Sequence, residues 1–117
     1  MERRIAISLL ALAACGSALA DDALKAAIAS AQRTPAFVAR DSWRHPYETL
    51  TFFGIRNHMT VVEISPGAGW YTEILAPYLR EQGKLILAAD DPQSSWPYYR
   101  RSAERLQARL LANPAAF

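Results

Sequence analysis

Apolar positions follow two kinds of spacing along the chain, one typical of helices and one typical of buried strands. Helical spacing occurs in "DDALKAAIASAQ", "PYETLTFFGI" and "PYYRRSAERLQARLLANP", so we predict a helix in each segment. Continuous apolar runs in "TVVEIS" and "KLILAADD" predict two strands, the first of them buried on both faces. The segment "RTPAFVARDSWRHP" has no sustained period, and we expect an extended arm that lies on the domain.

The second predicted helix carries recognisable signals at both ends. Pro46 suits a first helical position, and Gly54 suits a left-handed cap after the last turn. Helical spacing then turns one apolar face toward the predicted sheet. We expect this face to consist of Tyr47, Leu50 and either Phe52 or Phe53.

The last predicted helix starts at Pro97 and ends near Asn113 and Pro114. Its apolar face is expected to contain Tyr99, Ala103, Leu106 and Leu110. Its arginines are Arg100, Arg101, Arg105 and Arg109. We interpret these arginines as a solvated helix face, with their aliphatic stems lying over the core.

The turn "PGAG" follows the first predicted strand and precedes a helix. Gly67 and Gly69 can take positive φ and leave room for a ligand against the backbone, and the helix aims its free N–H groups at the same place. The apolar stripe of that helix consists of Ile74, Leu75, Tyr78 and Leu79. We expect Gly83 to close the helix and Pro77 to kink it or to shorten its regular part.

Two carboxylates follow the second predicted strand. In doubly wound folds ligands bind beyond the carboxyl ends of the strands, where an acid receives ribose hydroxyls. Gly69 and Asp90 are 21 residues apart, close to the separation of about twenty that nucleotide-binding folds use. We therefore expect the glycine turn and Asp90 to hold the two halves of a nucleotide.

The chain begins like an exported protein. The basic start "MERR" is followed by "IAISLLALAA", about ten apolar residues, which suits a signal-peptide core and is too short to span a bilayer. Two processing sites compete: cleavage after Ala20 leaves Asp21 first, whereas the lipobox-like "LAAC" makes Cys15 a lipid anchor. We expect an exported, periplasmic protein without a transmembrane helix, either free or lipid-anchored at Cys15.

Charge and titratable residues exclude several functions. The formal net charge is +2, and removal of two arginines and one glutamate with the signal peptide lowers it to +1. No basic stripe of the kind that binds nucleic acid is present, and cleavage after Ala20 removes the single cysteine, so we expect no disulfide and no metal site. His45 and His58 are interpreted as surface or arm residues, and no catalytic residue is assigned. Trp70 and Tyr71 suit either a cofactor pocket or packing against the arm.

The segments "RDSWRHPYETLTFFGI", "MTVVEISPGAGWYTEILAPYL" and "KLILAADDP" resemble a family of predicted class I S-adenosylmethionine-dependent methyltransferases with export signals. The resemblance runs from about Thr34 to the end. It implies S-adenosylmethionine as cofactor and an unknown methyl acceptor. It places the methionine part of the cofactor beside Glu63, Ser65, Pro66, Gly67, Ala68 and Gly69, and the ribose beside Asp90 or Asp91. Ser65 and Ala68 stand where this family is expected to have glycines.

The resemblance also implies a larger sheet. A class I methyltransferase has about seven strands, whereas two parallel strands cannot cover each other's faces or edges. We therefore expect an α/β chain with an incomplete Rossmann-like fold, a truncated copy or fragment too short to be active alone. The expected divisions are a signal peptide over 1–20, a helical and extended arm over 21–58, and the first part of a methyltransferase-like domain over 59–117. The strand from Lys84 to Asp90 should expose one face and one edge.

Three functions remain open at this point. The first is methyl transfer from S-adenosylmethionine. The second is a non-catalytic envelope protein that keeps part of a Rossmann-like fold as an interaction surface. The third is a dinucleotide enzyme such as a dehydrogenase, which is disfavoured because Thr72 stands at the third glycine position of G-x-G-x-x-G.

Overall fold

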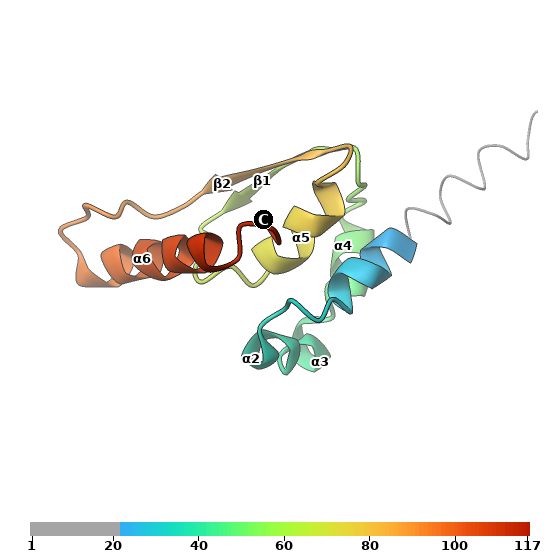
Figure 1. The fold of residues 1–117 in the computed structure, drawn as a ribbon, viewed down its shortest axis with the longest axis horizontal. Coiled ribbons are helices and arrows are strands. Elements are labelled where there is room, and N and C mark those ends of the chain that lie inside the picture. Colours follow the sequence, from blue (N-terminus) through green and yellow to red (C-terminus); the bar gives the residue numbers. More distant parts are fainter. Residues whose placement is uncertain (1–21) are drawn as a thin grey trace, which may run out of the picture.

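The computed structural model describes residues 22–117, in which helices pack on one side of a small two-stranded sheet (Figure 1). The predicted signal peptide and Cys15 lie outside the described residues. A first helix spans residues 22–28. It is followed by α2 (Pro35–Val38), α3 (Asp41–Arg44), α4 (Pro46–Phe52), β1 (Thr60–Ile64), α5 (Thr72–Leu79), β2 (Lys84–Ala88) and α6 (Pro97–Ala112).

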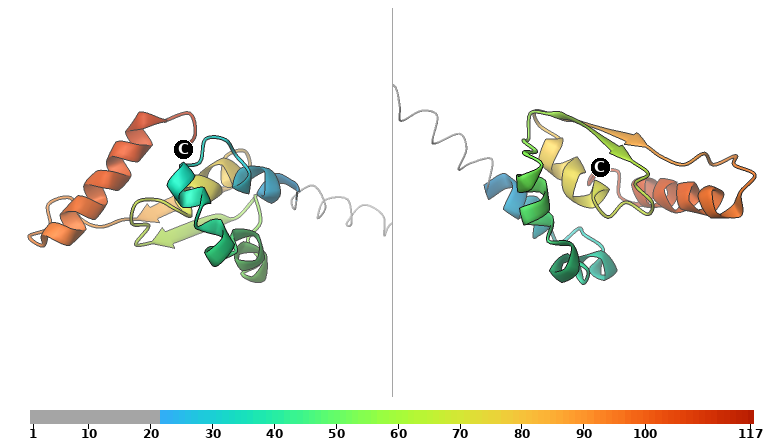
Figure 2. Two further views of the ribbon diagram at one scale, coloured as in Figure 1. Left: turned by 90° about the horizontal axis from the view of Figure 1, so that it is seen from below. Right: turned by 180° about the vertical axis from the view of Figure 1, so that it is seen from behind.

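The two strands form a parallel sheet with helices on one side. β1 pairs with β2 in a register that sets Thr60 opposite Lys84 and Ile64 opposite Ala88. Helix α5 connects them, and α4, α5 and α6 all lie below the sheet in Figure 1. Figure 2 shows the same arrangement from below and from behind. The predicted two parallel strands with flanking helices are therefore confirmed.

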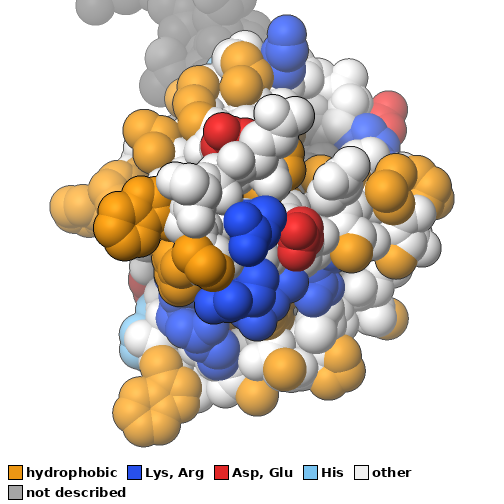
Figure 3. Space-filling view, turned by 90° about the vertical axis from the view of Figure 1, so that its left-hand side faces the viewer, with side chains coloured by type: hydrophobic (Ala, Val, Ile, Leu, Met, Phe, Trp, Pro, Cys, Tyr) orange, Lys and Arg blue, Asp and Glu red, His pale blue; other side chains and the backbone are white. Residues whose placement is uncertain are grey.

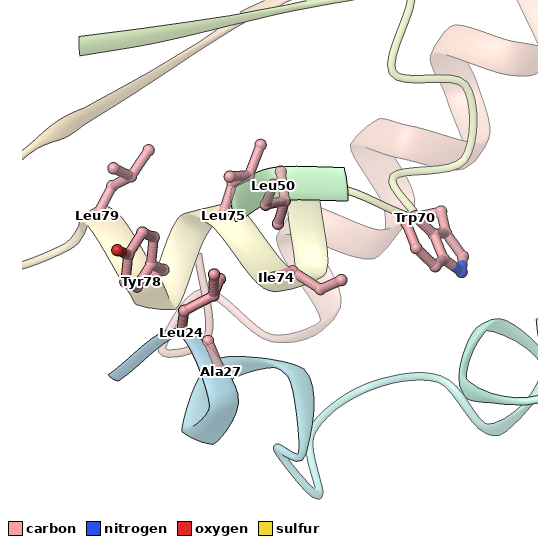
Figure 4. Close-up of a cluster of buried hydrophobic side chains, with 8 residues drawn as sticks. All are labelled: Leu24, Ala27, Leu50, Trp70, Ile74, Leu75, Tyr78 and Leu79. Atoms are coloured by element: carbon pink, nitrogen blue, oxygen red, sulfur yellow. The ribbon is translucent and has the colours of Figure 1, made fainter. Parts of the chain in front are cut away.

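Helix α5 supplies half of the residues in the main core cluster. Its stripe of Ile74, Leu75, Tyr78 and Leu79 is buried, as predicted, and packs against Leu24 and Ala27 of the first helix, Leu50 of α4 and Trp70 (Figure 4). Burying an aliphatic side chain of this size stabilises a fold by roughly 1.5–3 kcal/mol. The regular helix ends at Leu79, two residues after Pro77, which cannot donate the i→i−4 hydrogen bond.

Gly83 closes α5 for a different reason from the one predicted. Its amide donates to the Leu79 carbonyl at 2.8 Å, but the residue does not adopt a positive φ. A Cβ at this position would stand 2.5 Å from the Asn57 carbonyl oxygen and 2.6 Å from that of Met59. Glycine is required here because two backbone segments approach closely.

The open face of the sheet corrects the prediction for β1. Side chains alternate along a strand, so Val61 faces the core while Val62 and Ile64 are 53% and 78% exposed. On β2, Ile86 is 40% exposed on the same face, as the prediction of an uncovered face required. No described element packs on this face. β1 therefore has apolar side chains on both faces but is covered on only one of them.

The predicted extended arm is also wrong, because it contains the one-turn helices α2 and α3. Pro35 occupies a first helical position in α2, and the Thr34 carbonyl accepts from the Phe37 and Val38 amides at 2.8 and 3.0 Å. His45, in the left-handed region at φ 43°, ends α3 and begins α4. Helices of four residues are too short to show an apolar period, so the sequence pattern could not reveal them.

Helix α4 begins and ends as predicted, but only part of its predicted apolar face is buried. Pro46 starts the helix and Gly54 takes φ 69°, as predicted. Leu50 is buried and Tyr47 half-buried. Neither phenylalanine faces the sheet: Phe52 is 86% exposed and Phe53 is exposed as well, since the helix presents only its Leu50 side to α5.

Helix α6 has the predicted bounds and a shorter buried face. Ala103 and Leu106 are buried, but Tyr99 is 47% exposed, because the first turns of α6 extend beyond the other elements (Figure 1). Figure 3 faces this end of the molecule, where basic and hydrophobic side chains lie side by side. Arg100, Arg101 and Arg105 are exposed as predicted. Between residues 22 and 117, no helix is long and apolar enough to cross a membrane.

Candidate ligand site at the glycine turn

Three residues of the turn between β1 and α5 have positive φ. Ser65, Gly67 and Gly69 have φ values of 52°, 59° and 91°. A left-handed conformation costs a non-glycine residue about 1–2 kcal/mol, so the Ser65 conformation needs support. Its amide donates to the Ala88 carbonyl at 3.0 Å, which extends the strand pairing past β1. Ser65 therefore adopts a backbone conformation that glycine would adopt without cost.

The two glycines have different surroundings. A Cβ on Gly67 would meet nothing within 4 Å, whereas one on Gly69 would stand 3.2 Å from Leu106 Cδ1. Pro66 lies between β1 and this pair and accepts the Gly69 amide at 2.9 Å. The backbone is thus open at Gly67, while the small size of Gly69 lets α6 pack against the turn.

Glu63 points from β1 toward the start of α5. Its Oε2 accepts a hydrogen bond from Thr72 Oγ1 at 2.7 Å, and Thr72 is 1% exposed. Burial raises the pKa of the Glu63 carboxyl above its ordinary value of 4.5, although the Thr72 hydroxyl and the charge of Arg44 act in the opposite direction. The buried hydroxyl of Thr72 is therefore committed to the carboxylate beneath the turn.

Arg44, at the end of α3, is the arm residue that contacts the aromatic side chains following the glycine turn. Its guanidinium carbon lies 4.3 Å from the centre of the Trp70 ring and 5.2 Å from that of Tyr71. Trp70 is buried and donates from Nε1 to the Phe37 carbonyl at 2.9 Å. Of the two interpretations of Trp70, packing against the arm is the one observed.

The acids after β2 lie at the same end of the sheet as the glycine turn, because Ala88 bonds to Ser65 across the two strands. Asp91 is exposed, and its Oδ1 accepts the Gln93 amide at 2.8 Å. Asp90 is half-buried, and its carboxylate accepts no hydrogen bond within residues 22–117. Of the two carboxylates, only that of Asp90 has both oxygens free to accept hydrogen bonds from a ligand, as far as residues 22–117 are concerned.

Two cavities lie beside the turn, and Glu63 lines neither of them, although its partner Thr72 lines the first. One of about 540 Å³ lies between α5, β2 and α6 and is lined by none of the residues predicted to bind the cofactor. Another of about 480 Å³ is lined by Ala68 of the turn together with the arm and α6. His45 and His58 are exposed, as predicted. In the described part of the chain, no three His, Cys, Asp or Glu side chains gather as a metal site would require.

Sequence reasoning missed two ion pairs that hold the arm. Arg33 is buried and donates to both carboxylate oxygens of Asp41 at 2.5 and 2.9 Å. Buried Glu73 accepts the Thr34 amide at 2.9 Å and the Thr34 hydroxyl at 2.6 Å, and forms an ion pair with Arg109. Arg109 is thus not part of the solvated face predicted for it. An acid inside the apolar stripe of α5 was the signal, since buried charges require partners.

No family model, curated protein or solved structure matches the chain.

Proposed function

We propose that this chain binds S-adenosylmethionine at the turn between β1 and α5 as a methyltransferase-like protein, with an acceptor that is unknown. In this proposal the fold is the first part of a Rossmann-like domain. Glu63, Ser65, Pro66, Gly67, Ala68 and Gly69 surround the methionine part. Asp90 receives the ribose hydroxyls. When bound, S-adenosylmethionine supplies the methyl group on its sulfonium.

The observation that carries the proposal is the Glu63 carboxylate held by Thr72 beneath the glycine turn. A glycine turn before a helix attracts anions such as pyrophosphate. A carboxylate at the same place opposes a phosphate and attracts a cation. S-adenosylmethionine carries a sulfonium and an ammonium group, so this charge supports it over a dinucleotide.

The residues of this chain bind and orient the ligand. Gly67 leaves the backbone open on one side of the turn, and Asp90 has a carboxylate without a partner among the described residues. Methyl transfer depends mainly on positioning of the reacting atoms. No described residue is assigned a proton-transfer role, because both histidines are exposed and neither has a catalytic partner.

Titration calorimetry on the purified protein tests the proposal. We expect binding heat with S-adenosylmethionine and none with a nicotinamide dinucleotide. Asp90→Asn should weaken binding about tenfold through the loss of a charged hydrogen-bond acceptor, whereas its neighbour Asp91→Asn should change binding less than about twofold. Absence of heat with S-adenosylmethionine in the folded wild-type protein would contradict the proposal.

A second candidate function rests on the open face of the sheet. Val62, Ile64 and Ile86 expose apolar area that monomeric proteins usually cover. This supports the non-catalytic alternative, an exported protein that uses the sheet as an interaction surface. Absence of ligand heat, together with a molecular size that increases with concentration, would favour it.

A further inference from the structure

Arg44 differs from the two other arginines that hold the arm in place. Arg33 donates to both oxygens of Asp41 and to the Ile28 carbonyl, and Arg109 pairs with Glu73. The guanidinium of Arg44, which is half-buried, donates no hydrogen bond to any residue from 22 to 117. Arg44 is thus a fixed cation whose donors remain available.

Stacking explains how Arg44 is fixed without hydrogen bonds. Its guanidinium lies within 4.3 Å of the Trp70 ring centre and 5.2 Å of the Tyr71 ring centre, and Trp70 is itself held by Phe37. A guanidinium that stacks on aromatic rings leaves the N–H groups at its edge free to bind a carboxylate with two parallel hydrogen bonds.

The carboxylate of Glu63 and the guanidinium of Arg44 contact two consecutive residues. Arg44 lies 5.2 Å from the Tyr71 ring centre, and Glu63 accepts a hydrogen bond from Thr72, yet the two side chains form no direct ion pair in the described structure. Glu63 is bonded instead to Thr72. A cation and an anion that are held near each other but apart match the two charged groups of a free α-amino acid end.

We propose that Arg44 binds the carboxylate, and Glu63 the ammonium, of a ligand's free α-amino acid end, so that the arm forms part of the ligand site. The inference rests on the proposed function, since the methionine part of S-adenosylmethionine has such an end. It adds a binding residue from α3, which lies outside the glycine turn. It also gives the arm a role in recognition besides its role in packing.

Two probes isolate this contact. S-adenosylhomocysteine carries the amino acid end, and 5′-methylthioadenosine keeps the adenosine and the sulfur but lacks that end. Wild-type protein should bind S-adenosylhomocysteine more tightly. Arg44→Gln should weaken that binding about ten- to a hundredfold, the range for a charged hydrogen bond, and change 5′-methylthioadenosine binding less than about twofold. Arg40→Gln, an exposed arginine on the same arm, should change neither.

The outcomes separate this inference from the proposed function. If wild-type protein binds neither probe, the proposed function fails and the inference fails with it. If it binds both but Arg44→Gln weakens both equally or neither, the ligand site stands and the role of Arg44 is overturned. Retained binding of 5′-methylthioadenosine shows that the variant is folded. If Arg44→Gln does not fold, Arg44→Lys should weaken S-adenosylhomocysteine selectively, and an equal effect on both probes overturns the inference.

Discussion

The two faces of the β1–β2 sheet have similar apolar composition and different surroundings. On one face Val61 and Leu85 pack against the core cluster that α5 dominates. On the other face Val62, Ile64 and Ile86 are exposed. The difference teaches that apolar strand residues show which faces a strand can bury, while the neighbouring elements decide which faces are buried.

The largest expected effect comes from the covered side. Ile74→Ala removes a side chain that is 0% exposed, and we expect the free energy of unfolding to fall by about 2–5 kcal/mol because a cavity remains. Ile64→Ala on the open face should cost less than about 1 kcal/mol. Urea unfolding of both variants measures the comparison. Equal losses would mean that the open face is covered in solution.

A smaller effect is expected where the covered side meets the arm. Arg109→Met should lower the free energy of unfolding by about 1–3 kcal/mol, since it leaves the buried Glu73 carboxylate without its cation. Arg109 keeps 26% of its side chain exposed, so solvent limits the loss. Arg105→Met, on the exposed side of the same helix, should stay within about 0.5 kcal/mol. An equal response of the two variants would refute the role of the ion pair.

The smallest expected effect is a pH dependence of stability that arises from Glu63, at the end of the covered face of the sheet. Burial raises the pKa of Glu63 above 4.5 in the folded protein, so the folded state holds this proton more tightly than the unfolded chain. Its contribution to stability is therefore present below pH 4.5 and is lost as pH rises through the folded pKa. Glu63→Gln should remove this decrease. Unfolding free energies measured across that pH range, in both proteins, check the sign, and an unchanged slope would contradict it.

Local patterns predicted much of the fold. The bounds of α6, the capping roles of Pro46 and Gly54, and the buried stripe of α5 follow from residue types within a few positions of each other. The one-turn helices of the arm were missed because four residues do not establish a period. The exposure of Phe52, Phe53 and Tyr99 was missed because spacing does not reveal how far a facing element extends.

The candidate site likewise has one part that the sequence predicted and another that it did not. Glycine spacing predicted the turn, and Gly67 and Gly69 have the expected positive φ. The partners that give the site its charge are distant in sequence: Arg44 reaches Trp70 from the arm, and Thr34 reaches Glu73 across 39 positions. No motif within either segment indicates these pairs.

Helices, strands and the glycine turn follow from the sequence because backbone conformation and apolar spacing act over a few residues. The uncovered face of the sheet, the ion pair of Arg109 with Glu73 and the unpaired guanidinium of Arg44 depend on the tertiary structure. Burial and charge pairing are properties of neighbours in space, and in this chain those neighbours come from segments far apart along the backbone.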